Sequence, residues 1–404
     1  MTEEFCILIH YHEIALKGKN RSWFERRLIK NIKRQLNGLP FTKIQLNAAR
    51  IFCFGIDESL WNEYAQRLKK VMGIKHAFLM TQVKSDMDTI QSVAANQLKD
   101  LEFSSFRISA RRQYKNFHLT SQEINIMVGQ HLQSIYLKPV KLKHADVDVV
   151  IELVNGMAYI GYERIYGYGG LPVKTSEQAV SMISSGIDSP VSSFEMLKRG
   201  VELTYVHFHS APATSRQSIQ NVEEILTVLA GYQIQCRVYM VPLLEIQQKI
   251  MADAPNKLWV ILFRRAMIKL ASIIAEQLDI PALISGESVG QVASQTLSNI
   301  RATADAADRP ILRPLAGLNK EDIIRIAEKI GTYEISIEPY DDCCSFFVPI
   351  HPETKADLET VRKIEGNIDF GDMFDVALND AAIKTIEHPD YIKKTVHSLE
   401  KVND

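Results

Sequence analysis

A short run of small and acidic residues, Ser184 to Pro190, has the composition of a phosphate-binding turn. It follows an apolar run at 179–183 that suits a strand, and Pro190 suits the first turn of a helix. Free backbone N–H groups at a helix start hold phosphate, and small side chains let the backbone come close. No Gly-Lys-Ser or Gly-Lys-Thr follows, so a Walker loop is not expected. The pattern indicates a nucleotide phosphate site, with a plain strand-to-helix connection as the alternative.

Asp188 is the unexpected member of this turn, because a carboxylate beside phosphates is repulsive unless a cation lies between them. Mg²⁺ commonly bridges a carboxylate and nucleotide phosphates. The sequence therefore predicts Mg²⁺ between Asp188 and the nucleotide.

Two adjacent cysteines, Cys343 and Cys344, form a second candidate centre in a loop-like stretch. A redox-sensitive pair, part of a metal site and a pair of sulfur carriers are the open interpretations. No matching Cys or His spacing supports zinc. The neighbouring Asp341 and Asp342 favour the neutral thiol, which argues against an unusually reactive thiolate. The remaining cysteines lie in apolar, strand-like runs and are interpreted as core residues: Cys6, Cys53 and Cys236.

The elements around the Ser184–Pro190 turn alternate between strand and helix patterns. This alternation predicts a doubly wound, parallel α/β sheet, in which ligands bind beyond the carboxyl ends of the strands. The expected strands are 179–183, 201–208, 234–240 and 281–285, and the expected helices run from about 218 to a stop at Gly231 and from 258 to 277.

Two basic segments nearer the N-terminus are candidates for RNA contact. Residues 13–21 end at Asn20, a predicted helix cap, and lead into a helix with an apolar side and a charged side. Residues 106–115 run from an alternating strand into cations with an aromatic residue, a mixture that suits backbone contacts and stacking on RNA. Ordinary solvated charge is the alternative for both. A hairpin is predicted at Asn155-Gly156.

The bulk composition narrows the class of protein. The chain has 404 residues, 46% of them hydrophobic, with a formal net charge of -1, so several globular domains and only local basic surfaces are expected. The sequence has no long apolar run, so no membrane-spanning helix is expected. Its five cysteines are an odd number spread over a long chain, so no disulfide framework is expected, and a cytoplasmic location is predicted. Gly167 to Pro172 is interpreted as a domain boundary.

The motifs taken in order carry a resemblance to a known family. The turn at 184–189 resembles the Ser-Gly-Gly-x-Asp-Ser loop of ATP pyrophosphatases that adenylate their substrates, with Ser185 in place of the first glycine. The chain also resembles the tRNA 4-thiouridine synthetases (tRNA sulfurtransferases), in a short form without a rhodanese-like domain. The segments that carry this second resemblance are 13–21, 169–173, 285–296 and 338–344.

The resemblance implies a multidomain architecture of the α/β and α+β classes. The expected domains are a ferredoxin-like N-terminal domain at 1–58, a THUMP RNA-binding domain at 59–166 and an ATP pyrophosphatase-type catalytic domain at 174–404. Family members often form homodimers, so a homodimer that binds tRNA across both subunits is expected.

The resemblance also implies the activity: ATP adenylates the C4 oxygen of a tRNA uridine, and persulfide-derived sulfur replaces it to give 4-thiouridine. Asp188 and one of Cys343 and Cys344, with Cys344 slightly favoured, carry the catalytic roles, and Lys320 reaches the phosphates or the RNA. The implied ATP contacts are Met182, Ile183, Ser184, Gly186, Ser189, His207, Phe208, Arg264, Gly286 and Gln295. The RNA-contact candidates are Lys17, Lys19, Arg21, Arg111, Arg112 and Lys115.

Several alternatives accompany these assignments. A buried, hydrogen-bonded histidine is the plain interpretation of His207, and only one of Arg264 and Arg265 is expected to face the pocket. The expected sulfur donor is a cysteine desulfurase, and the family can also feed thiamine-thiazole synthesis. The competing functions are an RNA-binding protein with a degenerate nucleotide site, which Ser185 favours, and a different adenylating tRNA-modification enzyme.

Overall fold

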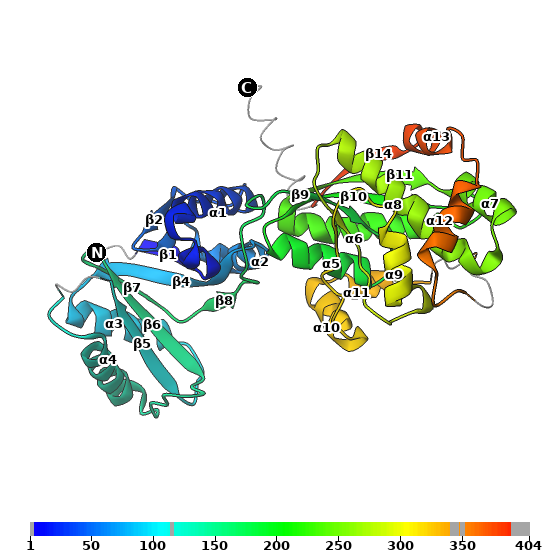
Figure 1. The fold of residues 1–404 in the computed structure, drawn as a ribbon. Helices are drawn as coiled ribbons and strands as arrows, with labels where there is room; N and C mark the ends of the chain where they lie inside the picture. Colours follow the sequence, from blue (N-terminus) through cyan, green and yellow to red (C-terminus); the bar gives the residue numbers. More distant parts are fainter. Residues whose placement is uncertain (1–3, 114–116, 340–346, 348–351, 389–404) are drawn as a thin grey trace, which may run out of the picture. The chain divides into compact units, whose positions relative to one another are not determined.

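The computed structural model describes residues 4–113, 117–339, 347 and 352–388. The chain divides into two compact units, Met1–Pro172 and Val173–Asp404, which we describe separately (Figure 1). Among the described residues, no helix is long and apolar enough to cross a membrane.

The first unit is built on an eight-stranded sheet with the order β2-β3-β1-β4-β7-β6-β5, and β8 also pairs with β4. Only β5 and β6 run parallel, and the other pairs are antiparallel. The strands are β1 (Glu4–Tyr11), β2 (Lys43–Asn47), β3 (Arg50–Phe54), β4 (Ile74–Lys84), β5 (Phe106–Arg112), β6 (Val147–Val154), β7 (Met157–Gly161) and β8 (Arg164–Tyr166).

Strand β1 is buried on both faces because alternate residues pack into two different cores. Ile7 and Ile9 lie in a core with helices α1 (Arg21–Gln35) and α2 (Trp61–Lys69). Cys6 and Leu8 lie in a second core with residues of β6 and β7. Strand β1 therefore contributes side chains to the packing on both faces of this sheet. A third core packs β5 to β7 against α3 (Met87–Leu98) and α4 (Ser121–Tyr136).

Local sequence signals account for several elements of this unit. The expected apolar side of α1 is buried at Leu28, Ile32 and the following Leu36. Asn20 is the residue that immediately precedes the helix, as predicted, but its side chain makes no capping hydrogen bond. The hairpin is confirmed: β6 and β7 meet at Asn155 and Gly156, whose φ values of 50° and 79° match a tight turn with two left-handed residues.

The second unit contains a six-stranded sheet with the order β13-β12-β9-β10-β11-β14. The first five strands are parallel, which confirms the predicted doubly wound arrangement, and β14 adds an antiparallel edge. The strands are β9 (Gln178–Met182), β10 (Glu202–His209), β11 (Gln235–Pro242), β12 (Leu283–Ile284), β13 (Ile311–Leu312) and β14 (Ala382–Glu387).

Helices cover both faces of this sheet (Figure 1). On one face α5 and α6 contact the central strands, and α10 and α11 pack on them. On the other face α7 and α8 share a large apolar core with α9, α12 and α13. The helices are α5 (Asp188–Lys198), α6 (Gln217–Gln233), α7 (Leu244–Asp253), α8 (Trp259–Gln277), α9 (Leu297–Ala304), α10 (Lys320–Ile330), α11 (Tyr333–Ser336), α12 (Leu358–Gly366) and α13 (Met373–Asn379).

Helix α6 corrects one sequence expectation. Gly231 was expected to end it, but the helix continues to Gln233. Gly231 is buried, and the Gln233 side chain bonds to backbone groups at Leu203 and Gln235, which holds the last turn on the sheet. Tertiary packing therefore outweighs the weak helix propensity of glycine here.

Gly161 at the end of β7 provides a test of the first unit. A Cβ atom there would lie 2.0 Å from the Leu79 carbonyl oxygen. This oxygen belongs to the backbone, so moving it aside would disturb the pairing of the strand. Gly161→Ala should lower the free energy of unfolding by about 1–3 kcal/mol or more, measured by urea denaturation. Gly129→Ala in α4 is the matched control, because its Cβ would meet nothing closer than 3.9 Å. An equal effect of both changes would contradict this packing.

Candidate nucleotide-binding site

The predicted phosphate loop lies between β9 and α5, and the Ser189 side chain closes it. Ser189 Oγ accepts a hydrogen bond from the Ser184 backbone N–H at 2.8 Å and donates to the Ser184 carbonyl oxygen at 3.0 Å. These two bonds hold the turn against the first residues of the helix. The start of α5 therefore presents its backbone N–H groups beyond the carboxyl end of the strand, where an anion is stabilised.

The serine that replaces the first glycine of the family loop causes no backbone strain. Ser185 is not among the residues with positive φ, so its backbone conformation is one that any residue adopts. Its side chain is buried, with 1% exposure. The loop can therefore keep its shape without glycine at this position.

Gly286 follows β12 and lies against the start of α5. A Cβ atom at this position would be 2.9 Å from the Ser189 backbone nitrogen and 3.0 Å from the Ser189 Cα. Only glycine permits so close an approach of two backbones. The absence of a side chain here brings the segment after β12 next to the phosphate loop.

A pocket opens beside the phosphate loop, at the carboxyl ends of β9, β10 and β12. It brings together every predicted nucleotide contact except Gly186, which is not among its lining residues. The lining residues are Met182, Ile183, Ser184, Asp188, Ser189, His207, Phe208, Arg264, Met267, Ile268, Ser285, Gly286, Glu287 and Gln295.

Four of these residues were not predicted. Ser285 and Glu287 flank Gly286 within the segment 285–296, which carries the family resemblance. Their position next to a predicted contact was the available signal for them. Met267 and Ile268 follow Arg264 by three and four residues, the spacing that puts side chains on one side of a helix. This helical spacing from Arg264 could have predicted Met267 and Ile268 as the apolar part of the pocket.

Both oxygens of the Asp188 carboxylate are engaged. Lys320 Nζ lies 2.6 Å from Oδ1, and Gln291 Nε2 donates to Oδ2 at 2.8 Å. Lys320 begins helix α10, and the Asn319 side chain caps this helix. The Lys320 ammonium group thus supplies a positive charge beside Asp188, where the sequence predicted Mg²⁺.

Arg264 and Arg313 share one carboxylate at the wall of the pocket. Glu287 Oε1 lies 2.6 Å from Arg264 Nη1, and Oε2 lies 2.6 Å from Arg313 Nε. Glu287 is only 6% exposed, so this pairing is screened little by solvent. One carboxylate between two guanidinium groups leaves a net positive charge at this wall, which suits an anionic ligand.

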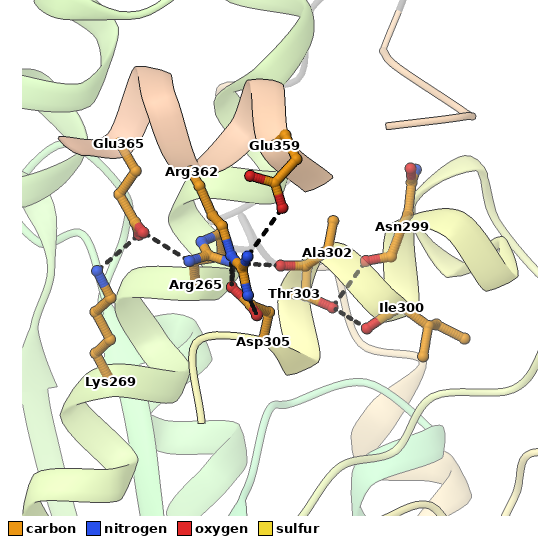
Figure 2. Close-up of polar contacts among 10 residues, drawn as sticks. All are labelled: Arg265, Lys269, Asn299, Ile300, Ala302, Thr303, Asp305, Glu359, Arg362 and Glu365. Carbon is orange, nitrogen blue, oxygen red and sulfur yellow. Dashed lines mark hydrogen bonds and ion pairs between the residues drawn. The ribbon is translucent and has the colours of Figure 1, made fainter. Parts of the chain in front are cut away.

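The neighbouring Arg265 does not line the pocket and belongs to a different network of polar contacts (Figure 2). It donates to Glu365 at 2.7 Å, lies 3.2 Å from Asp305 and also bonds to the Ala302 carbonyl oxygen. Lys269 and Arg362 complete the network around these acids. The structure therefore confirms that only one of the adjacent arginines lines the pocket: Arg264 does so, and Arg265 ties α8 to α9 and α12.

His207 lies under the pocket at the end of β10. Its Nδ1 atom is 3.0 Å from the Ile183 carbonyl oxygen, and the residue is 3% exposed. The ring therefore links two adjacent strands and also lines the pocket, so the structural and ligand-contact interpretations of His207 are compatible.

The RNA-contact candidates lie at two places in the first unit. Lys17 lies over the Phe24 ring, Lys19 is exposed, and Arg21 bonds to Glu25 and to the Tyr11 hydroxyl at 2.7 Å each. At the end of β5, Arg111 is exposed and Arg112 donates to the Phe117 carbonyl oxygen at 2.8 Å. Arg21 and Arg112 therefore also hold their own segments in place. Lys115 lies outside the described residues.

The three cysteines interpreted as core residues are buried. Burial raises the pKa of Cys53 and of Cys236 to about 12, and burial also raises the pKa of Cys6. Cys343 and Cys344 lie outside the described residues. Within the described residues, no group of three or more His, Cys, Asp or Glu side chains could hold a metal ion.

The buried thiols lead to a prediction for chemical labelling. Because a raised pKa keeps a thiol protonated, Cys6, Cys53 and Cys236 should resist iodoacetamide in the folded protein at mildly alkaline pH. Peptide mass spectrometry should find them unmodified in the native protein and modified after denaturation in guanidinium. Modification of any of the three at the native-state rate of an exposed thiol would contradict their placement.

Comparison with protein families accounts for most of the chain. A family described as "Thiamine biosynthesis protein (ThiI)" matches residues 174–370. The ThiI ferredoxin-like domain matches residues 6–77, and the THUMP domain matches residues 84–163.

The chain is also similar to complete relatives and to a solved structure. It is 39% identical to a probable tRNA sulfurtransferase of Moorella thermoacetica, over 94% of this chain and 97% of the relative. It is 37% identical to a probable tRNA sulfurtransferase of Thermus thermophilus, over 96% of this chain and 95% of the relative. A 4-thiouridine synthetase, solved as an RNA complex with bound ATP, matches with a TM-score of 0.85 and 34% identity, covering 95% of this chain and 100% of that one. The chain therefore belongs to the ThiI family, together with these tRNA sulfurtransferases.

Proposed function

We propose that this chain is an ATP-dependent tRNA sulfurtransferase that converts a uridine of tRNA into 4-thiouridine through an adenylated intermediate. The observation that carries the proposal is the pocket around the Ser184–Ser189 loop, which combines free helix N–H groups, cations and an apolar wall. The solved relative that binds RNA and ATP supports the same assignment.

In the proposed first step, the C4 oxygen of the uridine attacks the α-phosphorus of ATP. The bond from the α-phosphorus to its bridging oxygen breaks, and pyrophosphate leaves with the electron pair. The N–H groups at the start of α5 and the Arg264 guanidinium stabilise the charge that develops on the phosphates. Met267 and Ile268 offer an apolar surface for the adenine ring.

Lys320 and Asp188 control the charge at the phosphates. Lys320 is 41% exposed at its side chain, so it can exchange the Asp188 carboxylate for a phosphate oxygen. Asp188 is then free to hold Mg²⁺ together with the nucleotide phosphates, and one carboxylate with phosphate oxygens is a common ligand set for this ion. When bound there, Mg²⁺ would neutralise charge on the leaving pyrophosphate.

In the proposed second step, the outer sulfur of a cysteine persulfide attacks C4, the bond from C4 to the adenylated oxygen breaks, and AMP leaves. A second thiol then attacks the cysteine sulfur of this adduct, the S–S bond breaks and 4-thiouridine is released. The disulfide that remains on the protein is reduced by an external thiol. The three described cysteines are buried and have raised pKa values, so they are unsuited to carry sulfur. This supports Cys343 or Cys344 as the residue that handles it, with a cysteine desulfurase as donor. The ThiI family description supports a second role in sulfur transfer for thiamine-thiazole synthesis.

The first unit would hold the tRNA. We assign Lys17, Lys19, Arg21, Arg111, Arg112 and Lys115 to phosphate contacts. The proposed division is a ferredoxin-like domain at 1–58, a THUMP domain at 59–166 and a catalytic domain at 174–404, acting in the cytoplasm as a homodimer.

Asp188→Ala tests this function. With unmodified tRNA, Mg-ATP, cysteine and a cysteine desulfurase, the native protein should form thiolated uridine and AMP together. Asp188→Ala should abolish both products and leave the Kd for tRNA nearly unchanged, because Asp188 belongs to the nucleotide pocket.

Asp253→Ala is the matched control, because Asp253 forms a comparable ion pair with Lys249 at 2.9 Å outside the pocket. If Asp188→Ala also lost tRNA binding, the result would indicate that Asp188 has a structural role. Tight tRNA binding by the native protein without either product would favour an RNA-binding protein with a degenerate site.

Glu287→Gln tests the orientation of Arg264. A neutral amide cannot balance Arg264 and Arg313, so the guanidinium groups should separate and the KM for ATP should rise about tenfold, with a smaller change in kcat. Glu365→Gln is the control, because it also neutralises an acid that is mostly buried, between Arg265 and Lys269. It should lower the Tm and leave the KM for ATP unchanged. The same KM change in both variants would refute a specific role for Glu287.

A further inference from the structure

A second cavity lies at the carboxyl ends of β10 and β11, close to the nucleotide pocket. It has a volume of about 750 Å³, which is enough for a nucleoside. Its walls come from the ends of these strands, from the loop before α6 and from β14. Its lining residues include His209, Pro212, Thr214, Ile219 and Met240.

Hydrogen bonds hold the loop before α6 in place, so the cavity wall that it forms has a defined structure. Ser210 is fully buried and its hydroxyl bonds to the Gln247 side chain. The Thr214 backbone N–H donates to the Ser210 carbonyl oxygen at 3.2 Å. These bonds fix Thr214 at the cavity wall.

Two buried polar atoms at this wall lack partners. Thr214 is 3% exposed, and its hydroxyl has no hydrogen-bond partner among the described residues. The same holds for His209 Nδ1. Because buried polar atoms are unfavourable when unpaired, these two atoms favour a ligand that supplies both a donor and an acceptor.

The remaining walls are mostly apolar, with Pro212, Ile219 and Met240 among them. A flat ring with polar groups along one edge fits such walls better than an isolated phosphate does. Arg216 and Lys384 also line the cavity; Lys384 pairs with Glu223 at 2.5 Å, and Arg216 is exposed. Cations beside the cavity suit the phosphodiester groups on either side of an inserted nucleotide.

The edge of uracil matches these two polar atoms. It presents N3–H between two carbonyl oxygens, so a neutral imidazole can accept from N3–H while a hydroxyl donates to a neighbouring oxygen. Burial, and to a smaller extent the Arg216 guanidinium, lowers the pKa of His209, which keeps the ring neutral. His209 is therefore in the form that accepts a proton.

The cavity is also near the proposed chemistry. His207 lines the nucleotide pocket, and His209 follows it by two residues on the same strand, with ring centroids 6.5 Å apart. A base against His209 therefore lies next to the nucleotide pocket.

We propose that this cavity receives the reacting uracil of the RNA and that His209 accepts its N3 proton during adenylation. The proposal rests on the proposed function. As the C4 oxygen bonds to the α-phosphorus and pyrophosphate leaves, the N3–H bond breaks, its proton moves to His209 Nδ1, and its electron pair completes the N3–C4 double bond. Thr214 positions the base by a hydrogen bond to one of its carbonyl oxygens.

Single-turnover AMP formation that depends on RNA tests both residues. His209→Asn keeps a hydrogen-bond acceptor without a base and should slow AMP formation about 100-fold. Thr214→Val should slow it about tenfold. Both variants should keep the Kd values for ATP and tRNA. Thr227→Val is the control, because Thr227 is a half-buried threonine on α6 that bonds to the Glu223 carbonyl oxygen outside the cavity.

Photochemical crosslinking provides a readout that does not depend on activity. RNA with 4-thiouridine at the position that the native protein modifies should crosslink, on irradiation, to the loop from residue 210 to 219. A crosslink that maps elsewhere would overturn the proposal.

The outcomes separate this inference from the proposed function. Native protein that forms no AMP with RNA would refute the proposed function, whereas native turnover with unchanged His209→Asn and Thr214→Val rates would refute only this inference. If Arg216→Ala weakened tRNA binding while the His209 and Thr214 variants kept native rates, the cavity would hold a phosphodiester and the base assignment would be wrong.

Discussion

A carboxylate at the start of a helix sets the main electrostatic constraint on this protein. Asp188 begins α5, where backbone N–H groups attract phosphate, and its negative charge opposes the same phosphate. Lys320, from the distant helix α10, balances the charge at 2.6 Å, and Gln291 holds the other oxygen. These contacts bring three segments that are far apart in the sequence to one point. Gly286 completes the junction, because any larger residue would push the segment after β12 away from the phosphate loop.

The two adjacent arginines of α8 show how burial assigns different roles to identical side chains. Arg265 faces the core side and is held by Glu365 and Asp305, so its charge is used to join helices. Arg264 lies just over a quarter of a helical turn away and reaches the pocket, where it shares Glu287 with another arginine. A buried ion pair holds its geometry only when every charge has a partner. The Arg265 network therefore fixes α8, and a fixed α8 presents Arg264 to the ligand.

The sequence was most informative where residue type and spacing carry a local physical signal. The phosphate loop, the alternation of strand and helix and the Asn155-Gly156 turn all depend on neighbouring residues. It was least informative where distant segments meet. Nothing near Glu287 indicates that it pairs with Arg313, and no local signal indicates that β14 pairs with the distant strand β11. The cavity at Thr214 likewise depends on how a loop and three strands converge.

The direct transfer of an oxygen atom tests the central claim, which is that the uridine oxygen itself attacks the nucleotide. Unmodified tRNA that carries a heavy oxygen isotope at C4 of the target uridine should be converted with Mg-ATP and the sulfur donor. Mass spectrometry of the AMP should find the isotope in its phosphate group, in a ratio of one labelled AMP for each thiolated uridine. Thiolated tRNA with unlabelled AMP, or with the isotope in inorganic phosphate, would contradict adenylation of the base.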